Sequence, residues 1–235
     1  MTFCNVWEKY SAAAEVSSSN GLKFCKENFL NHVSLREIAD ARRQYLDLLC
    51  SAGFLDRGSI FSGGRRMTDK DLKSSHFNKH AGKREIVHSV ICAGLYPNVA
   101  ELEQGANLDV SIHDKTGTIY LHSSSTNARK KRFRSSERWL IFHEKFSTPH
   151  RTSVSATAFA HPFSLVLFGG TVVVKHTERL VVVDDWIKLD MAAQTGVMMR
   201  EIRAKVDRTL QKKIEGSTDE ADSDLLEGII QILDS

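Results

Sequence analysis

The sequence predicts an α+β fold in which a small helical segment precedes a five-stranded barrel and a C-terminal helix. Three observations lead to this prediction. Apolar residues recur every three or four positions over residues 34–53, as in an amphipathic helix, and alternate with polar residues from Val99 onward, as in strands. Helical spacing then returns over residues 192–214. We expect four parts: a helical segment (1–56), a flexible connector (57–82), the barrel with flanking helices (83–214) and an acidic tail (215–235).

The first 56 residues are expected to form helices. The strongest of them begins at Ser34, which can form a capping box with Glu37, and ends near Gly53, a residue suited to a helix C-terminus. Glycine, serine and basic residues dominate the following segment and indicate an exposed, partly mobile connector in which Ile60 is an isolated apolar residue. The two earlier helices are predicted over residues 2–10 and 22–31.

The barrel is expected after a helix over residues 83–93, because Pro97 disfavours helical geometry in the residue before it. A short helix over residues 162–168, ended by Gly169 and Gly170, interrupts the predicted strands between the fourth and the fifth. About five short strands with one intervening helix are typical of a small closed barrel. The predicted strands span residues 99–103, 119–122, 139–145, 152–158, 172–174 and 180–189.

Charge is distributed unevenly along the 235 residues. The formal net charge of +3 is too small to indicate a polyanionic partner. Residues 126–151, however, contain eight Lys or Arg against two Glu, whereas residues 215–235 contain seven Asp or Glu and no Lys or Arg. A basic middle and an acidic tail indicate a binding face and a solvated end, although the last dozen residues could also form a short amphipathic segment that docks.

Several classes of site are disfavoured. The four cysteines are far apart without a CxxC pair, which is typical of reduced, mostly buried thiols in an intracellular protein. No HExxH motif or Cys/His cluster indicates a metal site. No apolar run approaches the roughly 20 residues that cross a bilayer, and the N-terminus lacks a signal-peptide core, so we expect a cytoplasmic or nuclear protein without a membrane partner.

Five short motifs occur in an order that resembles a known family. They are FCKENFL (24–30), ARRQYL (41–46), CAGLYPNVA (92–100), LHSSS (121–125) and FGG (168–170). In this order they resemble the C-terminal region of the DEAH/RHA class of ATP-dependent RNA helicases, in which a helical ratchet segment leads into an oligonucleotide-binding (OB) barrel. The resemblance extends from about Thr2 to about Ile214. Two turns depart from it: Ser123 stands where the family has proline, and the STPHR turn (147–151) replaces a family T-S-K turn.

The resemblance also implies what this chain lacks. No GxxxxGK[ST] loop and no DEAH tetrapeptide occurs in the sequence. We therefore expect no cofactor in this chain, with ATP and Mg²⁺ bound by the motor domains of a parent helicase. By itself the chain should neither hydrolyse ATP nor unwind a duplex, and the sequence leaves open whether it is a fragment or a free protein.

The candidate binding residues lie in three segments. In the basic run, dense cations suit phosphates and Phe133 could stack on a base; a solvated loop or a nuclear-localisation-like patch is the alternative. In the serine-rich turn and the following hairpin, hydroxyls, amides and cations could contact a backbone, although an ordinary turn and surface charge would look the same. The candidates are Arg129, Lys130, Lys131, Arg132 and Arg134; His122, Ser123, Ser124 and Ser125; and Lys145, Thr148 and Arg151.

No catalytic constellation is visible. Glu144 is a lone carboxylate on a predicted strand, and Trp7, Trp139 and Trp186 are expected in the core. The predicted function is an accessory module that grips single-stranded RNA through its backbone, with the helicase motor domains or an activator protein as further partners. The alternative is a protein-interaction scaffold or regulatory fragment that has lost RNA binding.

Overall fold

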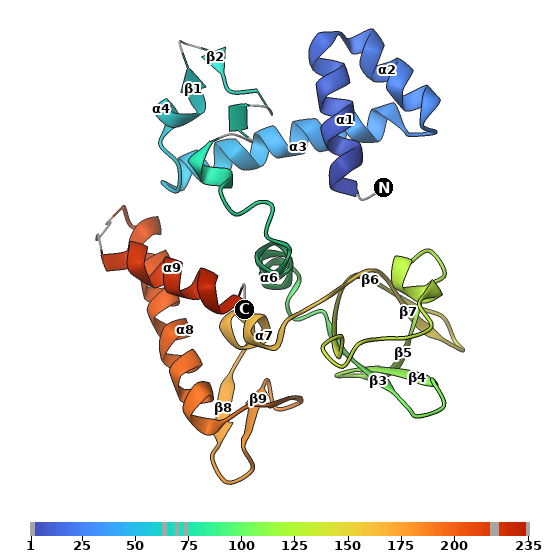
Figure 1. Cartoon of the computed structure of the whole chain (residues 1–235), viewed down its shortest axis with the longest axis vertical. Coiled ribbons are helices and arrows are strands. Elements are labelled where there is room, and N and C mark those ends of the chain that lie inside the picture. Colours follow the sequence, from blue (N-terminus) through green and yellow to red (C-terminus); the bar gives the residue numbers. More distant parts are fainter. Residues whose placement is uncertain (1–2, 63–64, 69–70, 73–74, 217–220, 234–235) are drawn as a thin grey trace. The chain divides into compact units, whose positions relative to one another are not determined.

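The computed structural model describes residues 3–62, 65–68, 71–72, 75–216 and 221–233, which belong to two compact units (Figure 1). Unit 1 comprises residues 1–79 together with 211–218, and unit 2 comprises residues 80–210 together with 219–235. Thr2 of the first predicted helix, and Gly63 and Gly64 of the predicted connector, lie outside the described residues.

Three helices form the main part of unit 1: α1 (Phe3–Val16), α2 (Ser18–Glu27) and α3 (His32–Ser51). They enclose a small core around Tyr10, Cys25 and Leu35. The predicted capping box is wrong, because α3 begins earlier and Asn31 caps it, its Oδ1 accepting from the backbone N–H of the second and third residues that follow. The predicted role of Gly53 is confirmed, since its φ of +76° follows the end of α3.

The segment predicted as a connector contains regular structure. It includes α4 (Arg57–Ile60), a two-stranded hairpin of β1 (Phe61–Ser62) and β2 (Arg65–Arg66), and the 3₁₀ helix η1 (His76–Asn78). The side chain of Ile60 is buried, and its carbonyl accepts a hydrogen bond from the N–H of Met67 at 2.9 Å. The expectation that Ile60 lies in an exposed segment is therefore wrong.

Unit 2 contains the predicted barrel, and its closure is confirmed. After α6 (Arg84–Leu95), five strands close in the order β3-β4-β5-β7-β6, with β5 and β7 parallel and the other pairs antiparallel. The strands are β3 (Val99–Gln104), β4 (Val110–Asp114), β5 (Gly117–Leu121), β6 (Trp139–Ser147) and β7 (Thr152–Phe159). The barrel interior contains Ala100, Leu102, Ile112, Ile119, Leu140, Phe142 and Val154.

The barrel strands differ from the predicted set in two ways. The sequence analysis missed β4, in which Ile112 is the sole buried residue and the rest of the strand resembles a polar loop. The strands predicted at 172–174 and 180–189 do not belong to the barrel. They form a separate three-stranded antiparallel sheet of β8 (Val172–Lys175), β9 (Leu180–Val183) and β10 (Ile187–Asp190). The barrel is thus complete before the intervening helix begins.

A second, larger core lies outside the barrel. It is enclosed by α6, α7 (Pro162–Phe168), the three-stranded sheet, α8 (Ala193–Ile214) and α9 (Ala221–Leu233) (Figure 1). Trp139 is buried there, with its ring centroid 6.1 Å from that of the partly buried Trp186, which confirms that both tryptophans are core residues. Ile229 and Leu233 are also buried in this core, so the end of the acidic tail docks as a helix.

The two glycines after α7 allow a close approach to the turn between β9 and β10. A Cβ on Gly170 would lie 1.9 Å from Oδ1 of Asp184. That oxygen accepts from the N–H of Thr171 at 2.7 Å, and Oδ2 accepts from the hydroxyl of Tyr96. Burial, followed by the hydrogen bond to Asp184, raises the pKa of Tyr96 to about 12. Position 170 of the FGG motif therefore has to be glycine for the segment after α7 to pack this closely against Asp184.

No helix among the described residues is long and apolar enough to cross a membrane. Of the three cysteines whose side chains are described, Cys25 and Cys92 are buried, Cys50 is half-buried, and all three are free thiols, as expected. The side chain of Cys4 lies outside the described residues.

Candidate nucleic-acid interface

The serine-rich turn directly follows β5. His122 and Ser123 are exposed, and the N–H of Ser124 donates to Nδ1 of His122 at 3.2 Å. Because a backbone N–H can only donate, Nδ1 accepts, and the neutral ring carries its proton on Nε2. Ser125 is buried instead, with its hydroxyl 2.8 Å from that of Thr157 on β7. Ser125 therefore stabilises the turn, and the outward groups come from the three residues before it.

The hairpin between β6 and β7 positions Thr148 and Arg151. The Thr148 hydroxyl donates to the Arg151 carbonyl at 2.8 Å and accepts from the Arg151 N–H at 3.0 Å. The Arg151 guanidinium lies 4.2 Å from the ring centroid of Tyr120 on β5. The turn therefore holds its arginine back over the barrel strands.

Lys145 is engaged within the barrel. Its ammonium group forms an ion pair with Asp114 at the end of β4 and donates to the hydroxyl of Thr116 at 2.8 Å. Burial alone would raise the pKa of Asp114, but the hydrogen bonds from Lys145 and Thr116 and the lysine charge hold that pKa below its usual range. This cation joins the β4–β5 hairpin to β6.

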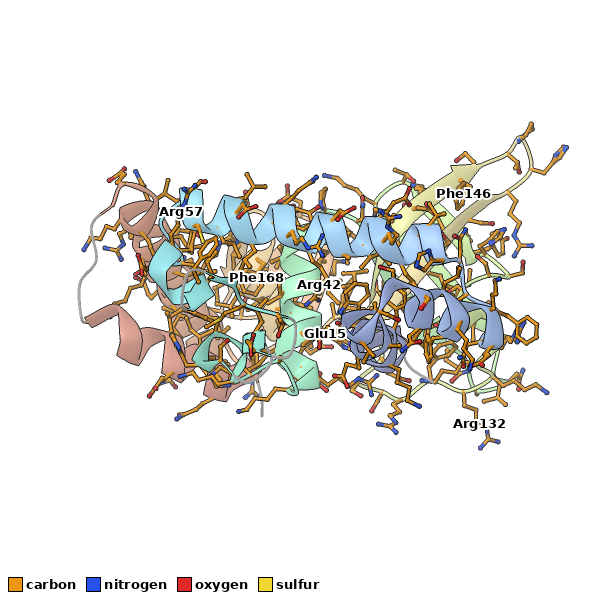
Figure 2. All side chains as sticks on the ribbon, turned by 90° about the horizontal axis from the view of Figure 1, so that it is seen from above. Glu15, Arg42, Arg57, Arg132, Phe146 and Phe168 are labelled. Atoms are coloured by element: carbon orange, nitrogen blue, oxygen red, sulfur yellow. The ribbon has the colours of Figure 1, made fainter. Side chains whose placement is uncertain are left out.

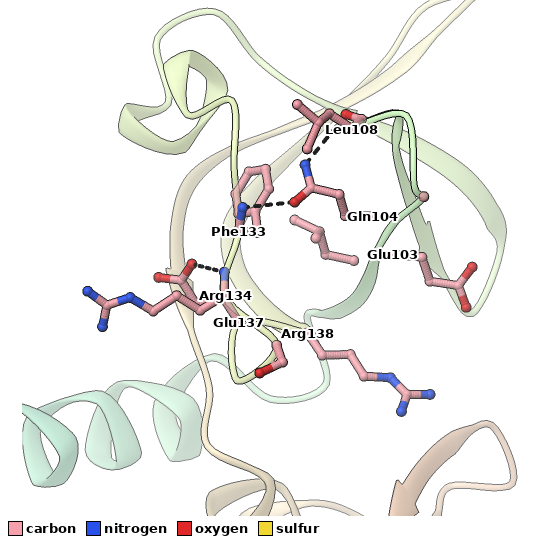
Figure 3. A pocket seen from close by; sticks show the side chains of 10 residues that line it. Glu103, Gln104, Leu108, Phe133, Arg134, Glu137 and Arg138 are labelled. Atoms are coloured by element: carbon pink, nitrogen blue, oxygen red, sulfur yellow. Dashed lines mark hydrogen bonds between the residues drawn. The ribbon is translucent and has the colours of Figure 1, made fainter.

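The basic run lies in the loop between β5 and β6, after the 3₁₀ helix η2 (Thr126–Arg129), and is held at two points, one on the barrel and one within the loop itself (Figure 3). At the first, the Gln104 side chain on β3 accepts from the N–H of Phe133 at 3.0 Å and donates to the carbonyl of Lys131 at 3.1 Å. At the second, Glu137 accepts from the N–H of Arg134 at 2.9 Å and from the ammonium group of Lys130.

Phe133 and Lys130 both face the barrel. Phe133 packs against the barrel interior, 6.0 Å from the ring of Phe159, and Lys130 lies 5.2–5.3 Å from both ring centroids. Burial favours a raised pKa for Glu137, but hydrogen bonds from Lys130 and the Arg134 N–H, and the charges of both residues, lower it overall. Lys130 and Phe133 therefore stabilise the loop. Phe133, the ring expected to stack on a base, is partly buried.

The other members of the run are exposed: Arg129, Lys131, Arg132 and Arg134, here called the basic loop. Arg132 projects from the barrel into solvent, well separated from Phe146 on the β6–β7 hairpin (Figure 2). Arg138, just beyond the loop, instead bonds Glu101 on β3 at 2.6 Å and Asp190 on β10 at 3.0 Å. Arg138 lines an open pocket of about 450 Å³ together with Arg134 of the basic loop and with Gln104 and Leu108 (Figure 3).

A second group of outward side chains was missed in the sequence. Tyr120 on β5 and Phe146 on β6 both pair with Ser153 of β7, and residues paired across strands point to the same face of a sheet. Their side chains are 45% and 47% exposed. The ring of His122 lies 5.9 Å from that of Phe146. We call Tyr120, His122, Phe146 and Arg151 the hairpin surface. For Tyr120 a sequence signal exists, because it alternates with the interior residues Ile119 and Leu121; Phe146 has the same parity along β6 as the interior residue Phe142, so alternation alone would have placed it inside.

The predicted site residues thus divide among three settings. Four cations form the basic loop, and His122 and Arg151 belong to the hairpin surface with Ser123, Ser124 and Thr148 in its turns. Lys145 and Ser125 are engaged in contacts with barrel residues, and Lys130 pairs with Glu137 within the β5–β6 loop. In the part of the chain that the structure describes, no group of three or more His, Cys, Asp or Glu side chains could hold a metal ion.

A closed five-stranded barrel with this strand order defines an OB-fold module, and its exposed cations and exposed strand aromatics are consistent with nucleic-acid binding. Comparison with protein families agrees. Residues 87–172 match the oligonucleotide/oligosaccharide-binding (OB) fold model, and residues 179–235 match the model of the C-terminal domain in RNA helicases. The chain belongs to the DEAH/RHA class of RNA helicases and corresponds to their C-terminal region, as the motif order predicts.

Curated relatives support the same assignment. The chain is 31% identical over 204 residues to the chloroplastic DExH-box ATP-dependent RNA helicase DExH4 of Arabidopsis thaliana, covering 81% of this chain and 14% of the relative. It is 28% identical over 230 residues to the ATP-dependent RNA helicase DHX29 of Homo sapiens, covering 95% of this chain and 16% of the relative. For the human ATP-dependent DNA/RNA helicase DHX36 the identity is 27% over 221 residues, covering 92% and 20%. The chain therefore spans about one fifth or less of the length of these relatives.

Proposed function

We propose that this chain is an RNA-binding module that grips single-stranded RNA through its sugar–phosphate backbone. The observation that carries the proposal is the basic loop, whose exposed cations stand on a segment tied to the barrel by Gln104 and held internally by Glu137. Cations that neutralise phosphates release condensed counterions, which supplies most of the affinity. A loop that is already held in place loses less conformational freedom when it binds.

In a full-length helicase, the module would hold the strand between ATP-driven steps. ATP and Mg²⁺ would act in the motor domains of that helicase, and these domains or an activator protein would be the protein partners of the module. The exposed amides and hydroxyls around Ser123 and Ser124 would add hydrogen bonds to phosphate oxygens.

The test is a fluorescence-anisotropy titration of the chain with labelled single-stranded RNA at several salt concentrations. The variant combines Arg132→Glu and Arg134→Glu, which leaves the Lys130–Glu137 pair intact. Each lost phosphate contact should reduce the slope of log affinity against log salt by about 0.7 for a single strand. We expect a slope reduced by about 1–1.5 and a marked loss of affinity at low salt.

The matched control combines Lys188→Glu and Lys205→Glu. Both residues are exposed, lie in unit 2 outside the barrel, and give the same change in net charge. An equal loss of affinity in both double variants would indicate general charge attraction and would contradict a specific grip by the basic loop. An absence of RNA binding by the unmodified chain at low salt would favour the scaffold alternative.

A further inference from the structure

We propose that the hairpin surface binds unpaired bases of single-stranded RNA by stacking, as a second contact separate from the backbone grip of the basic loop. The inference rests on the proposed function, because it requires that the module meets single-stranded RNA. It deepens that function by assigning base contacts to residues that neither the motif order nor the charge pattern identified.

The position of the rings within the strands is the first argument. Tyr120, Ser153 and Phe146 lie in register on three adjacent strands, with the small serine between the two aromatic side chains. Neighbouring strands lie about 4.8 Å apart, so the two rings are separated by roughly 10 Å at the backbone. The small central residue leaves room on this face, and the two aromatic positions would contact different nucleotides.

Arg151 provides the second argument. Its guanidinium carbon lies over the Tyr120 ring, 4.2 Å from the ring centroid, and the side chain is exposed. Both hydrogen bonds of the Thr148 hydroxyl to the Arg151 backbone hold the turn from which this side chain extends. Guanidinium planes and aromatic rings are the two kinds of surface on which unstacked RNA bases rest. A base on the outer face of Arg151 would extend an existing stack and meet a positive charge.

His122 completes the surface on the side of Phe146. The N–H of Ser124 fixes the His122 tautomer with its proton on Nε2, and the two rings lie 5.9 Å apart. An Nε2–H group beside a stacking ring could donate to a phosphate or a base acceptor.

This composition favours unpaired bases over a protein partner. A protein-docking surface is usually a contiguous apolar patch, whereas these two rings are separated by a serine and bordered by hydroxyls, a histidine and an arginine. Stacking requires flat rings, and the adjacent cation matches the negative charge of the strand. The occupant that fits this chemistry is a short unpaired stretch of RNA.

The experiment compares a 12-nucleotide single-stranded RNA with the same backbone carrying abasic sites at its central positions. The proteins are the full chain, the double variant Tyr120→Leu with Phe146→Leu, and Tyr45→Leu as a control on an exposed tyrosine of α3. Leucine retains apolar bulk but removes the flat ring. We expect the double variant to lose about 10- to 100-fold in affinity for the intact RNA, with an unchanged salt slope and an unchanged, weaker affinity for the abasic RNA.

The outcomes separate this inference from the proposed function. If the unmodified chain binds the intact and abasic RNAs equally, and the leucine variant binds like the unmodified chain, stacking is overturned while the backbone grip stands. If Arg132→Glu with Arg134→Glu reduces the salt slope by about 1–1.5 but only the leucine variant loses the preference for intact over abasic RNA, both hold. If the unmodified chain binds neither RNA, both fail. Retained circular dichroism and thermal unfolding of the leucine variant would show that lost binding is not lost folding.

Discussion

The two hydrophobic cores of unit 2 share the strands β3 and β6 but differ in extent. Along β3, Val99 belongs to the outer core and Ala100 to the barrel interior; along β6, Leu140 belongs to the interior and Ile141 to the outer core. The buried residues of the interior all lie on barrel strands, with Phe133 of the β5–β6 loop packed against them, whereas the outer core also includes residues of four helices and the three-stranded sheet. Because successive side chains of a strand point to opposite faces, β3 and β6 each contribute residues to both cores.

The outer core and the loops of the barrel are expected to differ in what they control, the first stability and the second binding. The outer core joins the barrel to everything that follows it in unit 2, including α9. The basic loop and the hairpin surface depend on the barrel strands and on polar contacts such as those of Gln104, Glu137 and Thr148. We therefore expect changes in the outer core to alter mainly the free energy of unfolding, and changes in the loops to alter mainly binding.

Trp139→Ala should give the largest effect. The side chain is 2% exposed and packs in the outer core, and truncation of a buried aromatic residue typically costs about 3–5 kcal/mol. Denaturant unfolding followed by circular dichroism would measure the loss. A cost below about 1 kcal/mol would contradict the view that the outer core dominates stability.

Gly170→Ala should destabilise the protein by about 2–3 kcal/mol, because the new methyl group would meet the Asp184 carboxylate and displace its bonds to Tyr96 and Thr171. Gly94→Ala is the matched control. A Cβ at that helical position meets nothing within 4 Å, so alanine should be neutral or stabilising. Equal unfolding midpoints for the two variants would contradict the steric argument.

Glu137→Gln should affect the loop more than the fold. It removes the charge that pairs with Lys130 while keeping an acceptor for the Arg134 N–H, so we expect a loss of about 1 kcal/mol. Trypsin should then cleave the basic loop several-fold faster. Glu103→Gln, an exposed glutamate on β3, is the control, and equal cleavage rates in both variants would sink the idea that Glu137 holds the loop.

The smallest expected effect is on pH dependence. His161 caps α7, its Nδ1 accepting from the N–H of Phe163 at 3.3 Å, and burial lowers its pKa despite the opposing charge of Glu85. Because the folded pKa lies below the unfolded value of about 6.5, this contribution to stability is complete above that value. It is lost as pH falls through the folded pKa.

His161→Asn keeps a good cap but does not titrate in this range. The decrease in unfolding free energy between pH 7.5 and 5.5 should therefore be smaller in the variant, by less than about 1 kcal/mol. Parallel pH profiles for the two proteins would show that His161 does not contribute.

Much of the fold was predictable because local patterns are strong where one face is buried. Four of the five barrel strands, α6, α7 and the core tryptophans follow from alternation and turn residues. β4 could not be predicted, because one buried isoleucine is too weak a pattern, and its strand identity depends on pairing with β3 and β5. The assignment of β8–β10 to a separate sheet likewise depends on partners distant in sequence.

By itself, the sequence determined the family, the presence of a barrel and the position of the basic run, because each is written in the order and spacing of nearby residues. Only the tertiary structure decided which of the predicted cations are available: Lys145 on β6 pairs with Asp114 at the end of β4, and the loop turns Lys130 onto Glu137. It also brought Tyr120, Phe146 and Arg151 onto one face. Strand registers and the Lys145–Asp114 ion pair join residues that are distant along the chain. A pattern of neighbouring residues cannot predict such partners.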